Sequence, residues 1–465
     1  MNIGLSRDLK KRIGKENVKT DAADLLAYAS DATHHYIKGR PDAVVLPLTV
    51  SHVAEIVGYA SKRGIPVIPR GAGSGLAGGS TSSRGGILLD MKRMNRVIEI
   101  NKGNLTAVAE AGVVLAHFHR LVEKERLFYP PDPQSMAVCT LGGNVSTRAG
   151  GPRGVKYGTT GNYILGLEVV LPDGSIIQTG GSCVKQSVGY DITHLMTGSE
   201  GTLGVITKVI TRLLPLPEAK KTIIVKCRTT EQAAFAVSEI ISNGIVPSML
   251  EYLSLGAVAL MNTLLSPPLV TDGEAYLFIE LDGSPLQIEE EGLRVKAVCE
   301  ALSVMEIRIV DDKKEAASYW KARSSLYPLL MSFLKKVIVE DVTVPRNRIP
   351  EFVKAVEKIA ASTGVAIGVS GHAGDGNMHP SILMGEISDE MEKKAHRAIE
   401  EIVACGLELG GSISGEHGIG IQKREFVMRE MGARQVSLFK AIKEAFDPKG
   451  IMNPGKIWLD GGKNR

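Results

Sequence analysis

The sequence has few cysteines, and their spacing excludes one class of metal and cluster sites. The five are Cys139, Cys183, Cys227, Cys299 and Cys405, and no two of them form a CxxC pair. Iron–sulfur clusters and thiolate zinc sites need closely spaced cysteines, so neither is expected here. A sparse, odd number of cysteines is typical of a compartment that keeps thiols reduced, so we expect a cytoplasmic protein.

Long apolar runs and strong charge are also missing. No stretch of about 18 apolar residues occurs, so no membrane span is expected, although attachment to the inner face of a membrane stays open. Residues 1–21 are charged and lack the apolar segment of a secretory signal. The net charge is only +4 and no dense run of Lys and Arg is present, which argues against nucleic acid as a partner.

Glycine, in contrast, is abundant. The chain has 51 glycines in 465 residues, which is about 11% where about 7% is usual. They follow no collagen-like period, and apolar segments separate them, so the excess does not come from a disordered tract. Because glycine has no Cβ, we expect these residues in loops where the backbone approaches something closely.

A domain boundary is expected near Pro215 and Pro217, which precede the charged pair Lys220 and Lys221. We therefore assign residues 1–216 to a first domain, residues 217–421 to a second, and residues 422–465 to a helical C-terminal segment. Strands and helices alternate after the boundary as in a split βαβ domain, so the fold class is α+β.

Several elements are predicted in detail. The first domain should contain a strand at 42–48 and a helix that Ser51 caps and Gly64 ends. Strands at 164–171 and 175–179 should form a hairpin. In the second domain we expect one strand over 337–344 and a helix that begins at Pro350.

A first glycine-rich stretch, residues 70–79, follows an expected strand at 65–68. Its GxGxG string invites a dinucleotide-binding interpretation, but that motif must open a helix, and here another glycine pair and a strand follow. The absence of GK[ST] excludes a Walker A loop. Such a loop can still wrap a diphosphate with its backbone N–H groups, and the alternative is a flexible surface loop.

Two more glycine-rich stretches lie in the same domain. They cover residues 141–161 and 198–204. Several surfaces of close approach in one domain favour a large ligand that lies across strands.

Two histidines bracket a turn in the second domain. His372 and His379 flank Ala373 to Met378, a strand precedes them and an apolar run follows, so the turn can bring both imidazoles near one point. Glu416 and His417 lie in another glycine-rich turn. Two histidines and a carboxylate can form a catalytic site for zinc, iron(II) or manganese. The alternative is a hydrogen-bonded turn with structural glycines.

Long motifs across the chain resemble one flavoprotein family. They are Pro69 to Gly79, Asp132-Pro133-Gln134-Ser135, Gly142-Gly143-Asn144, Ala149-Gly150-Gly151, Gly198 to Gly204, Gly371 to Asn377 and Gly415 to Gly418. Together they resemble the FAD-linked D-2-hydroxyacid dehydrogenases, the glycolate oxidase and D-lactate dehydrogenase branch of the vanillyl-alcohol-oxidase-type flavoproteins. The resemblance implies an FAD-binding domain of that type, a ferredoxin-like α+β cap domain for the substrate, and a C-terminal segment that returns to the FAD domain.

The resemblance also implies which residues would contact FAD. The residues around the diphosphate, flavin, ribityl chain and adenosine would be Arg70, Gly71, Ala72, Gly73, Ser74, Gly75, Gly78, Gly79, Asp132, Ser135, Gly142, Gly143, Asn144, Gly151, Glu200, Gly201, Gly204, Ile206 and Asn453. Some relatives tether FAD through a histidine in the first loop. No histidine lies between Arg70 and Asp90, so we expect non-covalent FAD.

The substrate residues follow from the same resemblance. His372, His379 and Glu416 would bind the metal, and His417 would be the general base. Arg323, in Trp320-Lys321-Ala322-Arg323, would hold the substrate carboxylate, and Asn377 would add a hydrogen bond. The implied reaction oxidises a small D-2-hydroxyacid, D-lactate or glycolate, to the 2-oxoacid with hydride transfer to flavin N5. Some relatives carry a lysine where this chain has Val339, which argues against larger or dicarboxylic substrates.

Without a cluster in this chain, electrons must leave the flavin for a separate acceptor. The candidates are an iron–sulfur subunit, an electron-transferring flavoprotein, or a quinone at a membrane. Two alternatives remain: an enzyme like alkyl-dihydroxyacetone-phosphate synthase, and a non-catalytic flavin electron-relay subunit. The His372, His379 and Glu416 set argues against the first, and a base and an arginine near a glycine-lined pocket argue against the second.

Overall fold

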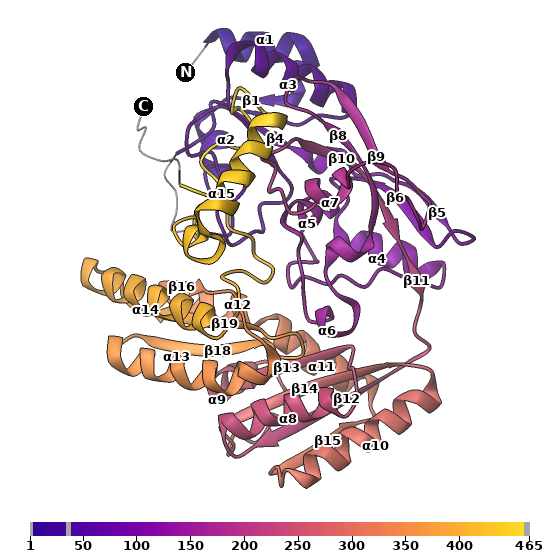
Figure 1. Cartoon of the computed structure of the whole chain (residues 1–465), viewed down its shortest axis with the longest axis vertical. Coiled ribbons are helices and arrows are strands. Elements are labelled where there is room, and N and C mark those ends of the chain that lie inside the picture. The colour runs from indigo at the N-terminus through magenta and orange to yellow at the C-terminus, as the bar shows by residue number, and fades with distance from the viewer. Residues whose placement is uncertain (1–2, 34–38, 460–465) are drawn as a thin grey trace. The chain divides into compact units, whose positions relative to one another are not determined.

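The computed structural model describes residues 3–33 and 39–459, which fall into two compact units (Figure 1). Unit 1 consists of residues up to Gly150, Thr159–Leu216, and the chain from Glu416 onward. Unit 2 consists of Gly151–Gly158 and Pro217–Gly415. The chain therefore leaves unit 1 and returns to it twice.

Unit 1 contains two main sheets. The first has the order β1-β2-β4-β3, in which β4 runs parallel to β2 and β3. The second is antiparallel, with the order β5-β6-β10-β8-β9. The strands are β1 (Val18–Lys19), β2 (Ala43–Val45), β3 (Val67–Arg70), β4 (Ile87–Asp90), β5 (Val97–Asn101), β6 (Thr106–Glu110), β7 (Leu127–Phe128), β8 (Ile164–Val170), β9 (Ile176–Gly180), β10 (Val205–Arg212) and β11 (Leu214–Pro215). The predicted hairpin is confirmed as β8 and β9.

Helices surround these sheets, and the core of unit 1 forms where α3 packs on the first of them. The helices are α1 (Ile3–Ile13), α2 (Ala22–Ala27), α3 (Val50–Arg63), α4 (Leu115–Lys124), α5 (Leu141–Thr147), α7 (Ile192–Met196) and α15 (Val427–Phe446). Ile56 and Val57 of α3 pack with Val45, Leu89 and Met452 in one buried cluster. Met452 forms an isolated bridge to Val67, so the C-terminal chain joins the first sheet.

The predicted N-cap of α3 is wrong by two residues. The helix begins at Val50, and the Thr49 side chain accepts a hydrogen bond from the backbone N–H of His52. An N-cap residue needs extended backbone angles, which Thr49 has, whereas Ser51 lies inside the first turn. Gly64 ends the helix in the left-handed conformation, as expected.

Unit 2 is built on an eight-stranded sheet. Its path is β15-β12-β14-β13-β18-β19-β16, and β17 pairs with β19. The strands are β12 (Ala219–Cys227), β13 (Met249–Ser254), β14 (Ala275–Gly283), β15 (Glu306–Val310), β16 (Lys336–Val339), β17 (Val342–Thr343), β18 (Ala366–His372) and β19 (Asn377–Met384). The order β15-β12-β14-β13, with α8 and α10 as crossovers, is the ferredoxin-like arrangement, so the predicted α+β class is confirmed.

Helices cover both faces of this sheet. They are α6 (Gly154–Tyr157), α8 (Thr230–Ser242), α9 (Leu255–Met261), α10 (Pro285–Ala301), α11 (Lys313–Ser324), α12 (Leu326–Phe333), α13 (Ile349–Thr363) and α14 (Asp389–Glu408). Figure 1 shows α14, α13, α8 and α10 in one layer. On the other face, Tyr319 and Ala322 of α11 and Met261 of α9 pack on Tyr276 and Phe278 of β14.

The predicted single strand over 337–344 is two strands. β16 pairs with Ser381–Met384 of β19, whereas β17 pairs with Asn377 and Met378. Glu340 and Asp341 stand between them, and both are fully buried. Glu340 N still donates to the Pro380 carbonyl oxygen of β19 at 2.8 Å, whereas the Asp341 carboxylate binds the Ser414–Gly415 segment, as described below.

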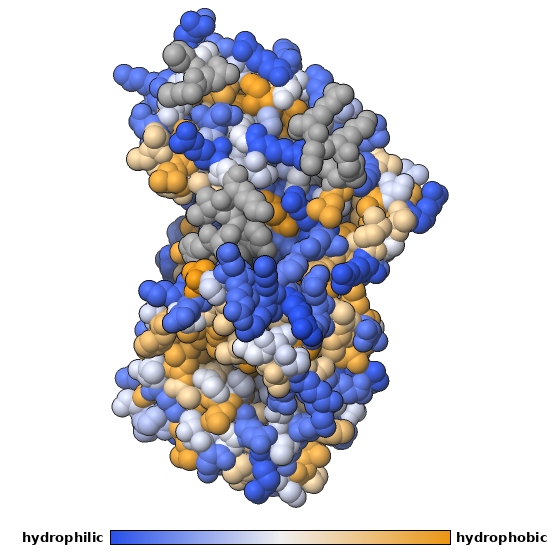
Figure 2. Space-filling view, turned by 90° about the vertical axis from the view of Figure 1, so that its left-hand side faces the viewer, coloured by the Kyte–Doolittle hydropathy of each residue, from blue (hydrophilic) through white to orange (hydrophobic). Residues whose placement is uncertain are grey.

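The surface mixes polar and apolar side chains, as the face in Figure 2 shows. Within residues 3–33 and 39–459, no helix combines the length and apolar character that crossing a membrane requires.

Candidate active site

The first glycine-rich stretch is a loop of unit 1 that joins two parallel strands. It runs from the end of β3 to the start of β4 without a helix, which agrees with the exclusion of a dinucleotide-binding helix. Arg70 ends β3 and is buried, and burial lowers the pKa of its guanidinium. A Cβ at Gly73 would lie 2.2 Å from that guanidinium, and Gly73 has a φ of 70°. Glycine is favoured at this position, because the backbone is left-handed there.

The second stretch forms a helix, α5, where a glycine-rich loop was expected. The Thr140 side chain caps it by accepting a hydrogen bond from Gly143 N at 3.3 Å. A Cβ at Gly142 would lie 2.5 Å from the Cβ of Ala111, so this glycine allows the helix to pack closely. Asn144 is 4% exposed, and among the described residues its Nδ2 has no hydrogen-bond partner. A buried amide donor without a partner fits a bound cofactor that accepts a hydrogen bond.

The C-terminal chain ties the first and third glycine stretches together within unit 1. Asn453 Nδ2 donates to the carbonyl oxygens of Gly79 at 2.9 Å and Glu200 at 2.7 Å. Both carboxylate oxygens of Glu200 accept backbone N–H groups, from Ile419 and Gly420, at 2.8 Å. Glu200 and Asn453, which we expected at the cofactor, therefore use these polar atoms to hold the glycine-rich loops of unit 1 together.

The other residues expected at FAD divide between the two units. Unit 1 holds Gly71, Ala72, Ser74, Gly75, Gly78, Asp132, Ser135, Gly201, Gly204 and Ile206, and unit 2 holds Gly151. A Cβ at Gly204 would lie 2.8 Å from Val169 Cγ1, so this glycine, like Gly142, has a packing reason of its own.

The two histidines of unit 2 lie side by side on a β-hairpin. His372 ends β18, His379 lies in β19, and their ring centroids are 5.1 Å apart. They are 2% and 7% exposed. His372 Nδ1 lies 2.6 Å from Glu251 Oε1, and His379 Nδ1 lies 3.2 Å from the Glu340 carbonyl oxygen. Because each Nδ1 has a partner of its own, each Nε2 can serve as a metal ligand, the usual arrangement at protein metal sites.

Glu251 is a site residue that sequence reasoning missed. It is fully buried on β13 and also pairs with Arg323, whose guanidinium nitrogen lies 2.5 Å from Oε2. Burial raises the pKa of Glu251, but His372 and Arg323 together lower it more, so the pKa lies below its ordinary value. One carboxylate thus holds a predicted metal ligand and the predicted carboxylate-binding arginine. In the sequence, Glu251 could have been noticed as the one acidic residue of the otherwise largely apolar strand Met249–Ser254.

Arg323 retains a donor that it could use on a ligand. It is 4% exposed, and within the described part of the chain its Nε has no hydrogen-bond partner. Glu251 therefore fixes one edge of the guanidinium and leaves Nε for another acceptor.

Asp341 is a second buried carboxylate that organises unit 2. It accepts from Asn377 Nδ2 at 2.6 Å, Ser414 Oγ at 2.7 Å and Gly415 N at 3.0 Å. One of its oxygens also lies within 4.8 Å of a His379 ring nitrogen. Asp341 therefore fixes the segment directly before Glu416, and it occupies one hydrogen of the Asn377 amide.

Glu416 and His417 begin the last part of unit 1. They are partly buried, and His417 Nε2 lies 3.9 Å from Glu416 Oε1. A Cβ at Gly150 would lie 2.7 Å from Glu416 Oε2. The structure thus brings His372, His379, Asn377 and Arg323 together in unit 2, and Glu416 with His417 in unit 1.

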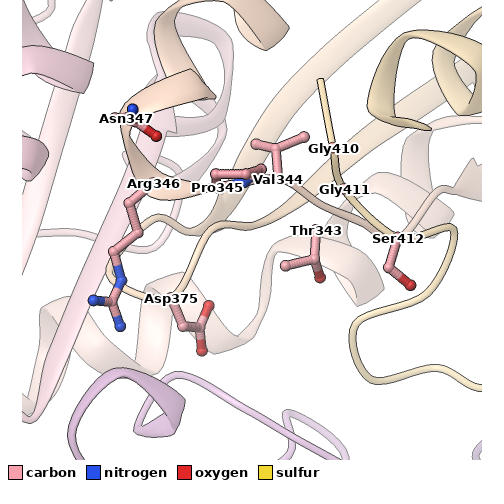
Figure 3. A pocket seen from close by; sticks show the side chains of 9 residues that line it. All are labelled: Thr343, Val344, Pro345, Arg346, Asn347, Asp375, Gly410, Gly411 and Ser412. Carbon is pink, nitrogen blue, oxygen red and sulfur yellow. The ribbon is translucent and has the colours of Figure 1, made fainter. Parts of the chain in front are cut away.

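A separate pocket of about 640 Å³ opens on unit 2. Figure 3 shows the residues that line it: Thr343, Val344, Pro345, Arg346, Asn347, Asp375, Gly410, Gly411 and Ser412. None of the residues predicted for the substrate or the metal lines this pocket. It lies beside the histidine hairpin, which contributes only Asp375.

Comparison with known proteins identifies the class. The family described as FAD linked oxidases, C-terminal domain, matches residues 216–457, and the family described as FAD binding domain matches residues 41–180. The glycolate oxidase subunit GlcD of Bacillus subtilis (strain 168) is 39% identical over 99% of both chains. A D-lactate dehydrogenase of Archaeoglobus fulgidus is 34% identical over 93% of this chain and 95% of that one.

Solved structures share the fold at lower identity. A p-cresol methylhydroxylase matches 98% of this chain and 96% of its own with a TM-score of 0.82, at 20% identity. An alkyldihydroxyacetonephosphate synthase matches 98% of this chain and 86% of its own with a TM-score of 0.78, also at 20% identity. The vanillyl-alcohol-oxidase-type fold is thus confirmed.

The chain belongs to the FAD-linked oxidase family. It is an FAD-dependent hydroxyacid oxidoreductase.

Lys456 gives unit 1 a pH-dependent stability. It is 3% exposed, its Nζ donates to the Thr81 carbonyl oxygen at 2.6 Å, and burial lowers its pKa to about 8. An unfolded lysine has a pKa of about 10.4, so between pH ~8 and ~10.4 the unfolded state binds more protons. The free energy of unfolding of FAD-free protein should therefore rise through this window, by about 3 kcal/mol from Lys456.

Tyrosines titrate in the same pH range, so the contribution of Lys456 is obtained by comparing variants. We expect the rise to be absent from Lys456→Met in chemical denaturation between pH 7 and 10, and retained in Lys124→Met, which removes an exposed lysine of α4. Identical pH dependence in Lys456→Met and the parent protein would contradict the expectation.

Proposed function

We propose that the protein oxidises a small D-2-hydroxyacid, D-lactate or glycolate, to the corresponding 2-oxoacid. The observation that carries this proposal is the buried Glu251, which holds His372 and Arg323 on its two oxygens. That arrangement holds His372, a proposed metal ligand, and Arg323, the proposed binder of the substrate carboxylate, on one buried carboxylate. The names of the relatives, glycolate oxidase subunit and D-lactate dehydrogenase, support the same substrates.

A divalent metal fits the residues of unit 2. His372 Nδ1 faces Glu251 and His379 Nδ1 faces the Glu340 carbonyl oxygen, so Nε2 is the ring nitrogen that each histidine would offer to a metal. Glu340 and Asp341 are two further buried acidic residues of unit 2. We propose His372, His379 and Glu416 as ligands of zinc, iron(II) or manganese. When bound, the ion would acidify the substrate hydroxyl.

Protein side chains supply the remaining chemistry. Arg323 would bind the substrate carboxylate through its Nε. His417 would take the proton of the substrate hydroxyl, for which imidazole is suited near neutral pH. Asn377 would add a hydrogen bond to the substrate, with Asp341 holding its amide in place. FAD, when bound, accepts the hydride from the substrate Cα.

The FAD is proposed to be non-covalent, held by unit 1 with help from Gly151. The buried, unpartnered Nδ2 of Asn144 supports a cofactor at α5. No histidine lies in the first loop, between Arg70 and Asp90, where a tether would attach. Flavin that stays with the chain after denaturation would overturn this assignment.

Electrons are proposed to leave for a separate acceptor, an electron-transferring flavoprotein or an iron–sulfur subunit, or for a quinone. The five cysteines are all free thiols with no cluster spacing, which also supports a reducing, cytoplasmic setting. Contact with the inner face of a membrane would serve transfer to a quinone.

Anaerobic mixing with a panel of hydroxyacids tests the proposal. We expect the flavin absorbance of the purified protein to bleach with D-lactate or glycolate and to stay unchanged with L-lactate. No bleaching with any 2-hydroxyacid would instead favour the electron-relay subunit. Turnover of an acyl dihydroxyacetone phosphate would favour the synthase-like alternative.

Glu251→Gln should weaken metal binding by about 10- to 100-fold, the usual effect of losing an outer-shell partner of a metal-ligating histidine. Glutamine keeps the shape of the side chain but removes the charge that orients His372 and holds Arg323. Metal titration of the chelator-treated protein measures the effect. Glu280→Gln is the matched control, since Glu280 is a buried carboxylate of the adjacent strand that pairs with Lys220. Equal affinity in both variants would remove Glu251 from the metal site.

A further inference from the structure

A short segment of eight residues leaves unit 1 and belongs to unit 2; we call it the excursion. Gly151–Gly158 belongs to unit 2, although the chain before and after it belongs to unit 1. Gly151 and Gly158 have φ values of 147° and 75°, so glycine stands where the chain enters and leaves the excursion. Gly151 is also one of the residues expected at the flavin.

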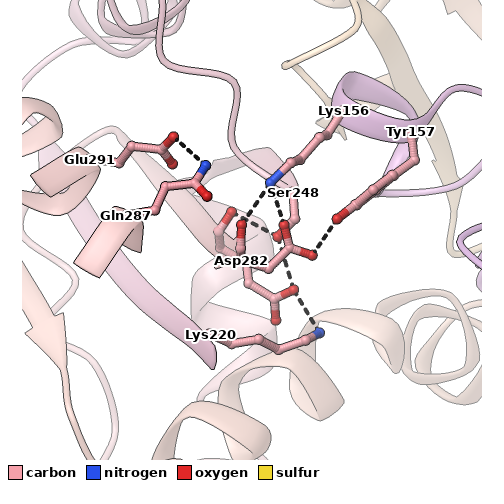
Figure 4. A network of polar contacts seen from close by, with 8 residues as sticks. Lys156, Tyr157, Lys220, Ser248, Asp282, Gln287 and Glu291 are labelled. Carbon is pink, nitrogen blue, oxygen red and sulfur yellow. Dashed lines mark hydrogen bonds and ion pairs between the residues drawn. The ribbon is translucent and has the colours of Figure 1, made fainter. Parts of the chain in front are cut away.

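One buried carboxylate holds this excursion in place. Lys156 Nζ lies 2.6 Å from Asp282 Oδ1 and 2.7 Å from the Asp282 carbonyl oxygen, and Tyr157 Oη donates to Oδ2 at 2.8 Å (Figure 4). Asp282 is fully buried near the end of β14. Both carboxylate oxygens of Asp282 thus bind adjacent residues of α6. These contacts fix α6 against the end of β14, and removing one charge alone would leave the other uncompensated.

The same excursion packs against the turn of the histidine hairpin. A Cβ at Gly374 would lie 2.7 Å from Val155 Cγ2, and a Cβ at Gly154 would lie 2.1 Å from Asp375 Oδ2. Gly374 N donates to the Leu250 carbonyl oxygen at 3.0 Å, which anchors the turn beside Glu251. The excursion therefore contacts the turn that joins His372 to His379.

We propose that Lys156, Tyr157 and Asp282 are positioning residues for hydride transfer. They clamp the excursion on the histidine hairpin and thereby hold Gly151, the residue of unit 2 expected at the flavin, in place relative to the substrate residues of the same unit. The inference rests on the proposed function, because it assumes that the hairpin binds the substrate. Hydride transfer requires reacting atoms about 3–3.5 Å apart, and a displacement of about 1 Å can cost about 100-fold in rate.

Two variants test the clamp. Tyr157→Phe removes one hydrogen bond and keeps the ion pair. The double variant Lys156→Met/Asp282→Asn removes both charges, so that no uncompensated charge is left buried. In anaerobic stopped-flow mixing with the hydroxyacid that bleaches the parent protein, we expect the limiting rate of flavin reduction to fall about 3-fold or more in the first and about 10- to 100-fold in the second. Flavin content, metal content and half-saturating substrate concentration should stay near the parent values, and Lys156→Arg should restore most of the rate.

The ion pair of Lys220 with Glu280 gives the control, since Glu280 lies on the same strand as Asp282. Lys220→Met/Glu280→Gln should leave the limiting rate unchanged. Parent rates in Tyr157→Phe and the Lys156/Asp282 double variant overturn the proposal. A fall in rate that only follows a loss of flavin or metal also overturns it, because the residues would then be merely structural. If the parent protein itself bleaches with no hydroxyacid, the proposed function fails instead.

Discussion

Replacing His417 by alanine should slow reduction of the bound flavin by about 10²- to 10⁴-fold. The proposed mechanism removes a hydride from the substrate Cα and a proton from its hydroxyl, and alanine cannot accept that proton. His417 is partly buried, and it follows the Ser414–Gly415 segment that Asp341 fixes through two hydrogen bonds. Anaerobic single-turnover stopped-flow, followed at the flavin absorbance, measures the rate of reduction directly.

The control for this prediction is His396→Ala on α14, whose side chain is 54% exposed and pairs with Glu400. It should reduce its flavin at the parent rate. The His417 variant should retain FAD and substrate binding, so the loss should appear in the limiting rate. Unchanged single-turnover reduction in His417→Ala would remove the residue from the role of base.

Loss of the metal is expected to have the second large effect. His379→Ala should lower metal affinity by at least about 100-fold, the upper end of what loss of an outer-shell residue costs. The reason is geometric: His379 Nδ1 is held by the Glu340 carbonyl, and only its Nε2 can serve a metal beside His372. Metal content by elemental analysis and the rate of flavin reduction should fall together.

Chelation gives the same loss without a mutation. Treatment of the parent protein with a chelator should abolish flavin reduction, and adding back zinc, iron(II) or manganese in turn should show which ion restores it. His52→Ala, at the start of α3 in unit 1, is the control and should keep the parent metal content. Full activity in a protein shown to be metal-free would overturn the metal proposal.

Local signals in the sequence predicted many elements well. Gly64 ends α3, and Pro350 lies in the first turn of α13, which begins at Ile349, because a left-handed cap and a first helical turn each favour a particular residue type. The hairpin of β8 and β9 followed from a turn signal between two apolar runs. Each of these depends on residues within a few positions of one another.

Predictions failed where tertiary contacts decided the outcome. The glycines of α5 indicated a loop, but Gly142 is needed for packing on Ala111, and a helix forms. The strand expected over 337–344 breaks between Val339 and Val342, where the Glu340 carbonyl oxygen lies 3.2 Å from His379 Nδ1 and the Asp341 carboxylate binds the Ser414–Gly415 segment. Neither partner is close in sequence, so no local pattern could reveal the break.

The sequence by itself determined the family, the presence of an FAD-binding domain and the candidate residues, because long motifs carry that information in order along the chain. Only the tertiary structure showed which other residues hold the candidate residues in place. Glu251 lies 121 positions before His372 and 72 before Arg323, yet it touches both. Burial in a folded core is what makes one carboxylate hold two distant groups, since it removes the water that would otherwise satisfy each of them.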